Sequence, residues 1–220
     1  MTLDEIAKKY STDKCSNGHS YTQYYEMLFG GLRNSPLKLL EIGVKRGCSL
    51  RMWKEYFPNA QVFGVDITPR CKSLEEDRIK IFIGGQDDPS LWKSVESQVG
   101  MVDILIDDGS HMSAHQIASL DMAFRLVKPG GFYVIEDLQC SYAANYIAQS
   151  PVRCIDYLKT MVDKLNVNGA MMYGNKAARI ARVARRASRA GRPLTEFDVG
   201  IEAVMFFPYI CFIKKMSGVA

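Results

Sequence analysis

Acidic residues and histidines gather in two short stretches of the sequence. One reads Ile-Asp-Asp-Gly-Ser-His-Met-Ser-Ala-His over residues 106–115, and the other reads Val-Ile-Glu-Asp-Leu over residues 134–138. Each includes or follows an apolar run of strand length, so both are expected where the strands of a parallel sheet end. The side chains brought together there are Asp107, Asp108, Glu136 and Asp137. Carboxylates crowded at one edge repel one another unless a cation neutralises them. Oxygen ligands without thiols favour Mg²⁺, with Mn²⁺ or Ca²⁺ as alternatives.

Two histidines accompany these acids. His111 follows Asp108 by three residues, so it can face a substrate that the same metal holds. A neutral imidazole there can remove a proton from a hydroxyl group, and the metal assists by lowering the proton affinity of that hydroxyl. His115 lies four residues further along an expected helix and could share a metal with His111, in which case Zn²⁺ or Fe²⁺ would fit. We favour the simpler interpretation, in which His115 packs against the loop or orients it.

A turn with two glycines precedes these stretches in the chain. Gly43 follows the first expected strand and Gly47 lies four residues later, a spacing that lets the backbone approach a ligand closely. Asp66 closes the next strand about 20 residues downstream, where it can bind a ribose diol. Lys45 stands where a dinucleotide fingerprint needs its second glycine, which disfavours an NAD-dependent oxidoreductase. Glu41 offers an acidic neighbourhood to the positive amino group of S-adenosylmethionine, which has no phosphate, and the turn therefore predicts that cofactor.

Apolar runs of strand length alternate with segments of helical periodicity, which predicts a parallel sheet covered by helices on both faces. The expected strands are Leu37–Ile42, Gln61–Ile67, Ile79–Ile83, Val102–Ile106 and Gly131–Ile135. The expected helices lie around Leu50–Tyr56, Ser90–Gln98 and Ser113–Val127. Two further apolar runs, Ile201–Phe207 and Tyr209–Lys215, are too close together for a helical crossover, so we expect them to pair antiparallel. The predicted fold is α/β, with a doubly wound, Rossmann-like sheet.

These features resemble the class I S-adenosylmethionine-dependent methyltransferases over residues 37–215. The resemblance implies a seven-stranded sheet whose last strand is inserted antiparallel. The motif Asp-Asp-Gly-Ser-His-x-x-x-His, followed by Ile-Glu-Asp-Leu, further resembles the metal-dependent sugar O-methyltransferases that tailor macrolide glycosides, and their relatives that act on methylmannose oligosaccharides. This narrower resemblance implies that Asp108, Glu136 and Asp137 hold Mg²⁺. It also implies that His111 is the general base, which makes His111 and Asp108 the expected catalytic residues.

The same resemblance assigns residues to the cofactor. In the loop after the third strand, Gln86 or Asp87 would face the adenine, while Asp88 is equally well explained as the N-cap of the next helix. The remaining residues predicted to bind the cofactor are Glu41, Gly43, Gly47, Asp66 and Asp107.

The length of 220 residues and the 47% hydrophobic content are expected of a single folded domain over residues 1–220. Residues 1–36 are expected to be a helical preamble. Its Thr12-Asp13-Lys14 segment, with His19, Tyr21 and Tyr24, resembles a segment thought to close over the active site in the same enzymes. We therefore predict that the preamble acts as a lid.

Basic residues are concentrated in one segment. Eight of the 28 Lys and Arg residues lie between Lys164 and Thr195, a stretch without an acid, whereas the whole chain has 24 acidic residues. The rest of the protein is therefore acidic. Arginines over residues 176–192 recur at helical spacing, which predicts an arginine-faced helix. It could be a solvated face or an oligomer contact, a patch for an anionic substrate or a membrane surface, or a nucleic-acid contact. Because no RNA-binding module accompanies it, we expect no nucleic-acid partner and interpret residues 166–198 as a lid on the acceptor side.

Six cysteines occur singly, no apolar run is long enough to span a membrane, and the first residues lack the apolar core of a secretion signal. We therefore expect a cytoplasmic protein without a membrane span, and leave open whether it is a homo-oligomer. Its expected reaction is the Mg²⁺-dependent transfer of a methyl group from S-adenosylmethionine to a hydroxyl of a small-molecule or oligosaccharide glycoside. Two alternatives are an O-methyltransferase for a phenolic or catechol acceptor, and a non-enzymatic adaptor that binds RNA or a membrane through the basic helix.

Overall fold

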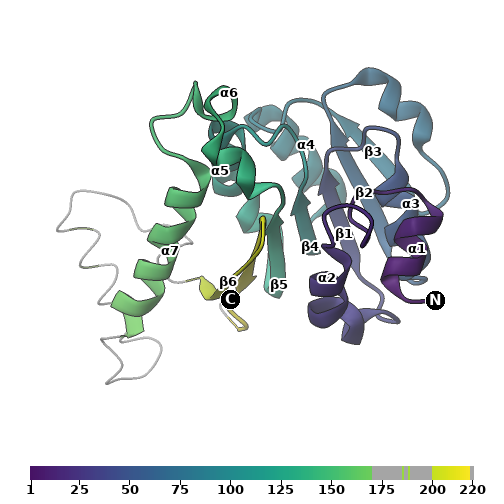
Figure 1. Cartoon of the computed structure of the whole chain (residues 1–220), viewed down its shortest axis with the longest axis horizontal. Helices are drawn as coiled ribbons and strands as arrows, with labels where there is room; N and C mark the ends of the chain where they lie inside the picture. The colour runs from purple at the N-terminus through teal and green to yellow at the C-terminus, as the bar shows by residue number, and fades with distance from the viewer. Residues whose placement is uncertain (170–184, 186–187, 189–199, 219–220) are drawn as a thin grey trace.

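A single mixed sheet runs through the molecule. In the part of the chain that the computed structural model describes, residues 1–169, 185, 188 and 200–218, the sheet has seven strands (Figure 1). They are β1 (Lys38–Ile42), β2 (Gln61–Asp66), β3 (Ile79–Ile83), β4 (Val102–Asp107), β5 (Val127–Ile135), β6 (Ile201–Phe207) and β7 (Ile210–Lys215). Their order across the sheet is β3-β2-β1-β4-β5-β7-β6.

The pairing of the strands confirms the predicted fold class. The first five strands pair parallel with one another, whereas β7 pairs antiparallel with both β5 and β6. The expected strands are therefore present, and the two C-terminal runs form the antiparallel pair. Most strand boundaries agree with the prediction to within one residue, and the larger difference is in β5, which begins at Val127 rather than at Gly131. Val127 pairs with Val102, and a register shift before Ile104 accommodates Pro129 and Gly130 within the strand.

Helices cover both faces of the sheet. They are α1 (Leu3–Lys9), α2 (Thr22–Phe29), α3 (Cys48–Tyr56), α4 (Pro89–Val99), α5 (Ser113–Ala123), α6 (Ala144–Ile147) and α7 (Cys154–Gly169). Short 3₁₀ turns occur at η1 (Gly30–Leu32), η2 (Pro69–Leu74), η3 (Phe124–Leu126) and η4 (Leu138–Tyr142). The helix expected over Ser113–Val127 thus ends at Ala123 and tightens into η3 before β5 begins.

Two hydrophobic cores result from this layering, one on each face of the sheet. Alternate strand residues such as Leu39 and Ile104 pack with α1, α2 and α3, while their neighbours Leu40 and Leu105 pack with α4, α5 and α7. Side chains alternate along a strand, so a strand buried on both faces must be apolar at nearly every position, as these strands are. No helix among the described residues is long and apolar enough to cross a membrane.

The N-terminal segment forms the expected helical preamble. Thr2 caps α1 through a capping box, in which its side chain accepts from the N–H of Glu5 and the Glu5 side chain accepts from the N–H of Thr2. Tyr25 and Phe29 of α2 are fully buried in the core that α3 shares. The preamble therefore packs as part of the domain, whereas its role as a lid stays a prediction. The basic segment expected over residues 166–198 lies almost entirely outside the described residues.

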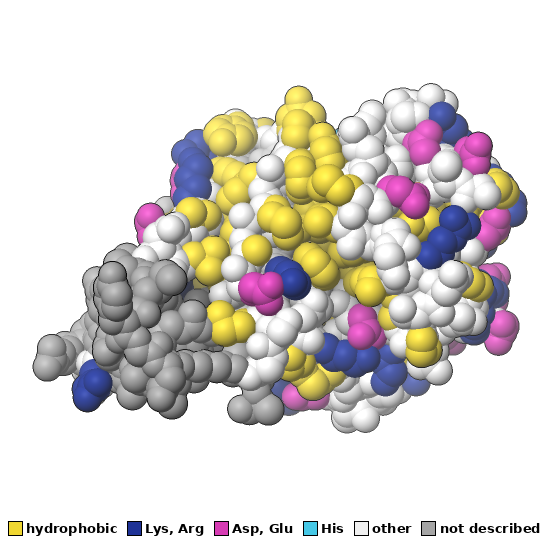
Figure 2. All heavy atoms as spheres, turned by 90° about the horizontal axis from the view of Figure 1, so that it is seen from below, with side chains coloured by type: hydrophobic (Ala, Val, Ile, Leu, Met, Phe, Trp, Pro, Cys, Tyr) yellow, Lys and Arg dark blue, Asp and Glu magenta, His cyan; other side chains and the backbone are white. Residues whose placement is uncertain are grey.

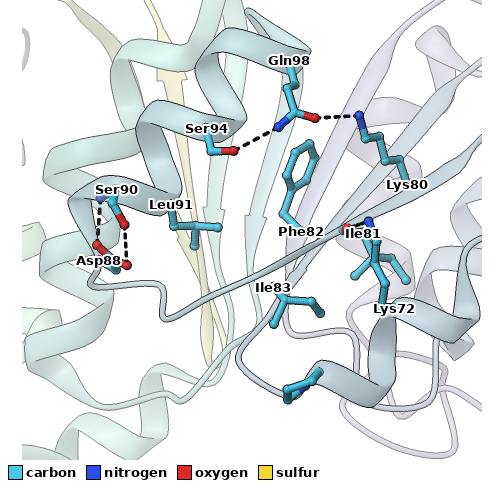
Figure 3. Close-up of a pocket in the computed structure, with 11 residues that line it drawn as sticks. Lys72, Lys80, Ile81, Phe82, Ile83, Asp88, Ser90, Leu91, Ser94 and Gln98 are labelled. Carbon is cyan, nitrogen blue, oxygen red and sulfur yellow. Dashed lines mark hydrogen bonds between the residues drawn. The ribbon is translucent and has the colours of Figure 1, made fainter.

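Apolar side chains also reach the surface. Figure 2 shows them gathered on one face of the molecule, and the exposed large hydrophobic residues include Met27, Phe206 and Tyr209. A cavity of about 560 Å³ lies along the edge strand β3, between η2 and α4 (Figure 3). Lys72, Lys80 and Gln98 line this cavity, and none of the residues predicted to bind the cofactor, the metal or the acceptor does so.

The central strand β4 provides a test of this packing. Leu105 is fully buried, so Leu105→Ala is expected to lower the free energy of unfolding by about 2–5 kcal/mol through lost burial and the cavity left behind. Met101 precedes the same strand and is 43% exposed, so Met101→Ala is expected to change it by no more than about 0.5 kcal/mol. Urea denaturation of both variants measures the difference, and equal losses would contradict the assigned burial.

Candidate active site

The register of the sheet brings the ends of three strands to one place. Ile42 at the end of β1 pairs with Asp107 of β4, which in turn pairs with Ile135 of β5. The ladder continues for one more residue, because the N–H of Asp108 donates to the carbonyl of Ile42 and the N–H of Glu136 donates to the carbonyl of Asp107, each at 3.0 Å. The acidic residues after β4 and β5 are therefore neighbours, as the sequence predicted.

A buried lysine of the preamble lies among these acids. The side chain of Lys14 is 1% exposed, and its ammonium contacts carboxylates from three strand ends. It lies 2.7 Å from Oε2 of Glu136 and 3.2 Å from Oε1 of Glu41, and it also pairs with Oδ2 of Asp108. The hydroxyl of Tyr25 donates to the other oxygen of Glu136 at 2.5 Å. The preamble thus contributes a cation and a hydroxyl to the acidic cluster.

Burial and mutual attraction set the protonation of this cluster. Burial alone would lower the pKa of Lys14, but Asp108, Glu136 and Glu41 together hold that pKa well above its usual range. Burial raises the pKa of Glu136 well above its ordinary value and that of Glu41 to about 7, in spite of the nearby ammonium. One ammonium among three carboxylates leaves the cluster negative when all of them are ionised, and such a cluster favours a further cation or a proton.

Asp108, His111 and Asp137 form a second group beside Lys14. Nε2 of His111 lies 3.4 Å from Oδ2 of Asp137 and 4.0 Å from Oδ1 of Asp108. One ligand atom from each of the three lies within 4.8 Å of the other two, an arrangement that could hold a metal ion. Both His111 (φ 59°) and Asp137 (φ 57°) have left-handed backbones, which a non-glycine residue adopts at a cost of about 1–3 kcal/mol. Strain of this kind clusters at functional sites, where surrounding contacts hold it.

The preamble also fixes Asp137. The hydroxyl of Tyr21 donates to Oδ1 of Asp137 at 2.7 Å, and Nδ1 of His19 lies 3.6 Å from the same oxygen. Partial burial alone would raise the pKa of Asp137, but hydrogen bonds from Gln139 and Tyr21, with His111 nearby, hold it below its usual range. Asp137 is therefore an anion at neutral pH, with its Oδ2 directed toward His111.

Asp107 turns to the opposite face of the sheet. It is fully buried, and its oxygens accept from the side-chain amide of Gln86 at 3.1 Å and from the hydroxyl of Ser119 at 2.5 Å. Burial raises the pKa of Asp107. Gln86 is itself only 7% exposed. Both residues were expected to touch the cofactor, but the structure bonds them to each other beneath the loop, and their contact with the cofactor stays a prediction.

The turn after β1 has the expected geometry for a close approach. Gly43 has φ 96°, and a Cβ there would collide with the carbonyl oxygen of Asp108, so only glycine fits between the two loops. Gly47 is the N-cap of α3 and has φ 70°. Asp66 accepts from the N–H groups of Val44 and Lys45, each at 2.9 Å, and so holds the turn in place.

Other residues near this turn have specific positions. Ile67, next to Asp66, is 73% exposed, an apolar side chain at the strand end that the sequence prediction did not single out. Glu41 is fully buried and accepts from the indole N–H of Trp53 at 3.0 Å, beside its contact with Lys14. The acidic neighbourhood expected of Glu41 is therefore shared with a lysine. Its contact with the cofactor, like those of Gly43, Gly47 and Asp66, stays a prediction.

The polar residues of the loop after β3 have different contacts. Asp88 is the N-cap of α4, and its side chain accepts from the N–H of Ser90, which confirms the capping interpretation. Asp87 is exposed and its Oδ2 lies 3.7 Å from Nε2 of His115. Nδ1 of His115 lies 2.9 Å from the hydroxyl of Ser110. His115 therefore orients the loop that carries His111, and it does not share a ligand group with it among the described residues.

Glu136 occupies a different position from the other two predicted metal ligands. Its oxygens are bonded to Lys14 and Tyr25, so it lies outside the group of Asp108, His111 and Asp137. Its assignment as a ligand stays a prediction. The sequence prediction placed Lys14 in the segment expected to close over the active site, and it assigned no individual role to Lys14 or to Tyr25. A charged residue within an aromatic preamble was the available signal, but nothing in the sequence paired Lys14 with acids 94 and 122 residues away.

The Lys14 cluster leads to a prediction about stability. Lys14→Met removes the one ammonium from three carboxylates and is expected to lower the free energy of unfolding by about 3–5 kcal/mol. Lys9 supplies the matched control, because it pairs with Glu55 at the surface and its side chain is 50% exposed, so Lys9→Met is expected to lower the free energy of unfolding far less. Urea denaturation at pH 7 distinguishes the two, and losses of equal size would show that the buried pairing does not stabilise the fold.

Asp66 leads to a prediction about pH. Burial would raise its pKa, but the N–H groups of Lys45, Thr68 and Val44 together hold it below its usual range. A carboxyl whose pKa is lower in the folded state stabilises the fold above its unfolded pKa and loses that effect as pH falls. Asp66→Asn is therefore expected to lower the free energy of unfolding by about 1–3 kcal/mol at pH 7 and by progressively less below about pH 4. Urea titrations between pH 3 and pH 7 check this, and a deficit that does not shrink at low pH would contradict it.

Comparison with known proteins gives the relationship of the chain. No family model matches it. A Streptomyces olivaceus protein, 8-demethyl-8-(2-methoxy-alpha-L-rhamnosyl)-tetracenomycin-C 3'-O-methyltransferase, is 39% identical over 176 residues, which are 74% of this chain and 45% of that protein. The 8-demethyl-8-alpha-L-rhamnosyl tetracenomycin-C 2'-O-methyltransferase of the same organism is 34% identical and covers 98% of this chain and 55% of its own length.

Solved structures agree with the sequence comparison. The MycE methyltransferase from the mycinamycin biosynthetic pathway, in complex with Mg, SAH and mycinamycin VI, superposes with a TM-score of 0.80 at 30% identity. The match covers 99% of this chain and 55% of MycE, so the chain spans about half the length of these relatives. Sequence and fold together show that the chain is a homologue of the sugar O-methyltransferases of tetracenomycin and macrolide glycosides, with the fold of the class I S-adenosylmethionine-dependent methyltransferases.

Proposed function

We propose that the chain transfers a methyl group from S-adenosylmethionine to a sugar hydroxyl of a small-molecule glycoside, in a Mg²⁺-dependent reaction with His111 as general base. The observation that carries the proposal is the group of Asp108, His111 and Asp137 at the ends of β4 and β5, beside the Gly43 turn. The relatives support the acceptor class, because they methylate sugars of tetracenomycin glycosides, and MycE binds Mg and SAH together with a macrolide glycoside. An oligosaccharide acceptor is the wider form of the same proposal.

The residues present fit a hard divalent cation. Asp108 and Asp137 offer carboxylate oxygens, and no cysteine belongs to this group among the described residues. Lys14 pairs with Asp108, whereas Asp137, whose pKa is held below its usual range, has no ammonium beside it among the described residues, so the group can attract a second cation. Oxygen donors of this kind favour Mg²⁺ over thiol-seeking metals. Glu136 joins the ligands only if it exchanges its bonds with Lys14 and Tyr25 for one to the metal. When bound, the ion would lower the proton affinity of the acceptor hydroxyl and fix its position.

The residues of the first two strand ends would hold the cofactor. Gly43 and Gly47 would let the turn approach the cofactor closely, and Asp66, which holds that turn, would bind the ribose. The exposed side chain of Ile67 would pack against the adenine, and the exposed carboxylate of Asp87 would accept a hydrogen bond from it. These contacts would set the methyl group toward the acidic edge of the sheet, where the acceptor binds.

His111 would complete the reaction by taking a proton. As the acceptor oxygen bonds to the methyl carbon and the carbon–sulfur bond breaks, the hydroxyl proton moves to Nε2 of His111 and S-adenosylhomocysteine is released. Nε2 is suited to this because it is directed toward Asp108 and Asp137, whose charges stabilise the imidazolium that forms. Asp108 and Asp137 therefore act both on the cation and on the base.

Two variants distinguish the proposed general base, His111, from a proposed metal ligand, Asp137. His111→Ala is expected to lower kcat by about 10²–10⁴-fold while leaving the Kd for Mg²⁺ nearly unchanged, because a general base acts on the proton and does not hold the ion. Asp137→Asn is expected to raise the Kd for Mg²⁺ at least about tenfold, because one of two proposed oxygen ligands loses its charge. Methyl transfer to a panel of rhamnosyl and related glycosides gives kcat, and calorimetric titration with MgCl₂ gives Kd.

Two control experiments test which class of acceptor is methylated and whether the reaction requires Mg²⁺. A parallel panel of catechols tests the phenolic alternative, and chelation with EDTA followed by added Mg²⁺ tests the dependence on the ion. Loss of Mg²⁺ binding in His111→Ala would make His111 a ligand and end its role as the base. Turnover of catechols but not glycosides, or full turnover in EDTA, would overturn the proposed function.

A further inference from the structure

Ser110, the residue before His111, is held from two sides. Its N–H donates to Oε1 of Gln86 at 2.9 Å, and its hydroxyl lies 2.9 Å from Nδ1 of His115. The same hydroxyl accepts from the N–H of Met112 at 3.3 Å. Ser110 itself is exposed, so these contacts, and not burial, fix the loop at this point.

Gln86 is a rigid partner for this loop. Its amide nitrogen donates to both oxygens of Asp107 at 3.1 Å, and its backbone carbonyl accepts from the indole N–H of Trp92 at 2.8 Å. A Cβ at Gly109 would collide with Oε1 of Gln86, so the loop lies directly against the amide. The amide can therefore satisfy Asp107 with its donors and Ser110 with its acceptor at the same time, which no apolar side chain of that length can do.

His115 links the same loop to the cofactor side of the site. The hydroxyl of Ser110 shares a hydrogen bond with Nδ1 of His115, and the other ring nitrogen of His115 is Nε2. That nitrogen lies 3.7 Å from Oδ2 of Asp87, the residue after Gln86. One loop, residues 86 and 87, thus reaches Ser110 by two routes, directly through Gln86 and indirectly through His115.

The backbone of His111 needs such support. A left-handed conformation in a residue with a side chain returns to a more common one unless its surroundings hold it. A displacement of about 1 Å in a catalytic group is enough to lower a rate by about 100-fold. Whatever fixes Ser110 therefore also fixes the position of the proposed base.

We propose that Gln86 and His115 are positioning residues, which brace Ser110 and so hold His111 in its working position, and that Gln86 does not bind the cofactor. The proposal rests on the proposed function for the role of His111. It differs from the sequence prediction for Gln86, and the two make opposite predictions about cofactor affinity.

The test of Gln86 compares kcat with cofactor affinity. Gln86→Met keeps the length of the side chain and removes its hydrogen bonds with Asp107, Ser119 and Ser110. It is expected to lower kcat by about 100-fold while changing the Kd for S-adenosylhomocysteine less than threefold. Gln98→Met is the matched control, because Gln98 is an exposed glutamine of α4 that lines the separate cavity along β3 (Figure 3). It is expected to change neither quantity. A raised Kd in Gln86→Met, with or without a loss of kcat, assigns Gln86 to the cofactor and overturns the proposal, as does an unchanged kcat.

The test of His115 does not depend on replacing a buried group. His115→Phe removes the contact with Ser110 and is expected to lower kcat by about 10–100-fold. His115→Asn places a side-chain oxygen where Nδ1 stood, accepts from the Ser110 hydroxyl again, and is expected to recover most of that loss. Equal activity of the two variants would show that the contact with Ser110 does not matter and would overturn this part of the brace.

A spectroscopic readout keeps the brace testable without turnover. In ¹H–¹⁵N spectra of the histidine rings, Gln86→Met and His115→Phe are expected to shift or broaden the signals of His111 and to leave those of His19 in place. Unchanged His111 signals in both variants overturn the brace. Failure of the proposed function would instead appear in the wild-type protein, as binding of S-adenosylhomocysteine without methyl transfer to any glycoside.

Discussion

The structure of this site depends on one buried ammonium group. Parallel strands that end together bring their terminal residues together, and here those residues are acidic on β1, β4 and β5. Three carboxylates at such a place would repel one another in a medium that screens charge poorly. Lys14 supplies the opposite charge from inside the preamble, and its side chain has almost no contact with solvent. The ion pairs therefore do two things at once, because they make the acidic edge compatible with folding and they tie the N-terminal segment to the strands.

This constraint determines which groups are left to do chemistry. Glu136 is buried and bonded to Lys14 and Tyr25. Glu41 is also buried, and it accepts from Trp53 and forms an ion pair with Lys14 at 3.2 Å. Asp108 is shared, with one oxygen toward Lys14 and the other toward His111. Asp137 is held at its other oxygen by Tyr21. The second oxygens of Asp108 and Asp137 thus lie near Nε2 of His111. Because Glu41 and Glu136 already have partners within the protein, we assign the proposed metal to Asp108 and Asp137 and the role of base to His111.

Much of the fold could be predicted because its signals are local. Strand-length apolar runs, helical periodicity and the N-cap at Asp88 depend on neighbours in the chain, and all of them are present in the structure. The start of β5 was missed because Pro129 and Gly130 are usually strand breakers, and a register shift in the pairing accommodates them here. The partners of Lys14 could not be predicted, because they belong to strands that only the folded sheet brings near the preamble. The positions of the strand ends were enough to predict that the acids lie close together. They were not enough to predict the face of the sheet toward which each acidic side chain points.

The two adjacent aspartates at the end of β4 illustrate that last point. Side chains alternate along a strand, so neighbouring residues at its end turn toward opposite faces. Asp108 faces the layer of α1–α3 and meets the ammonium of Lys14, while Asp107 faces α5 and meets only the neutral donors of Gln86 and Ser119, with a backbone N–H. Asp108 has charged partners, and it suits a cation site. Asp107 is surrounded by fixed dipoles, which makes it an anchor for the loop that follows β4. Two consecutive aspartates thus have different roles in the proposed site. Asp108 provides a charge for the cation, and Asp107 fixes the position of the loop.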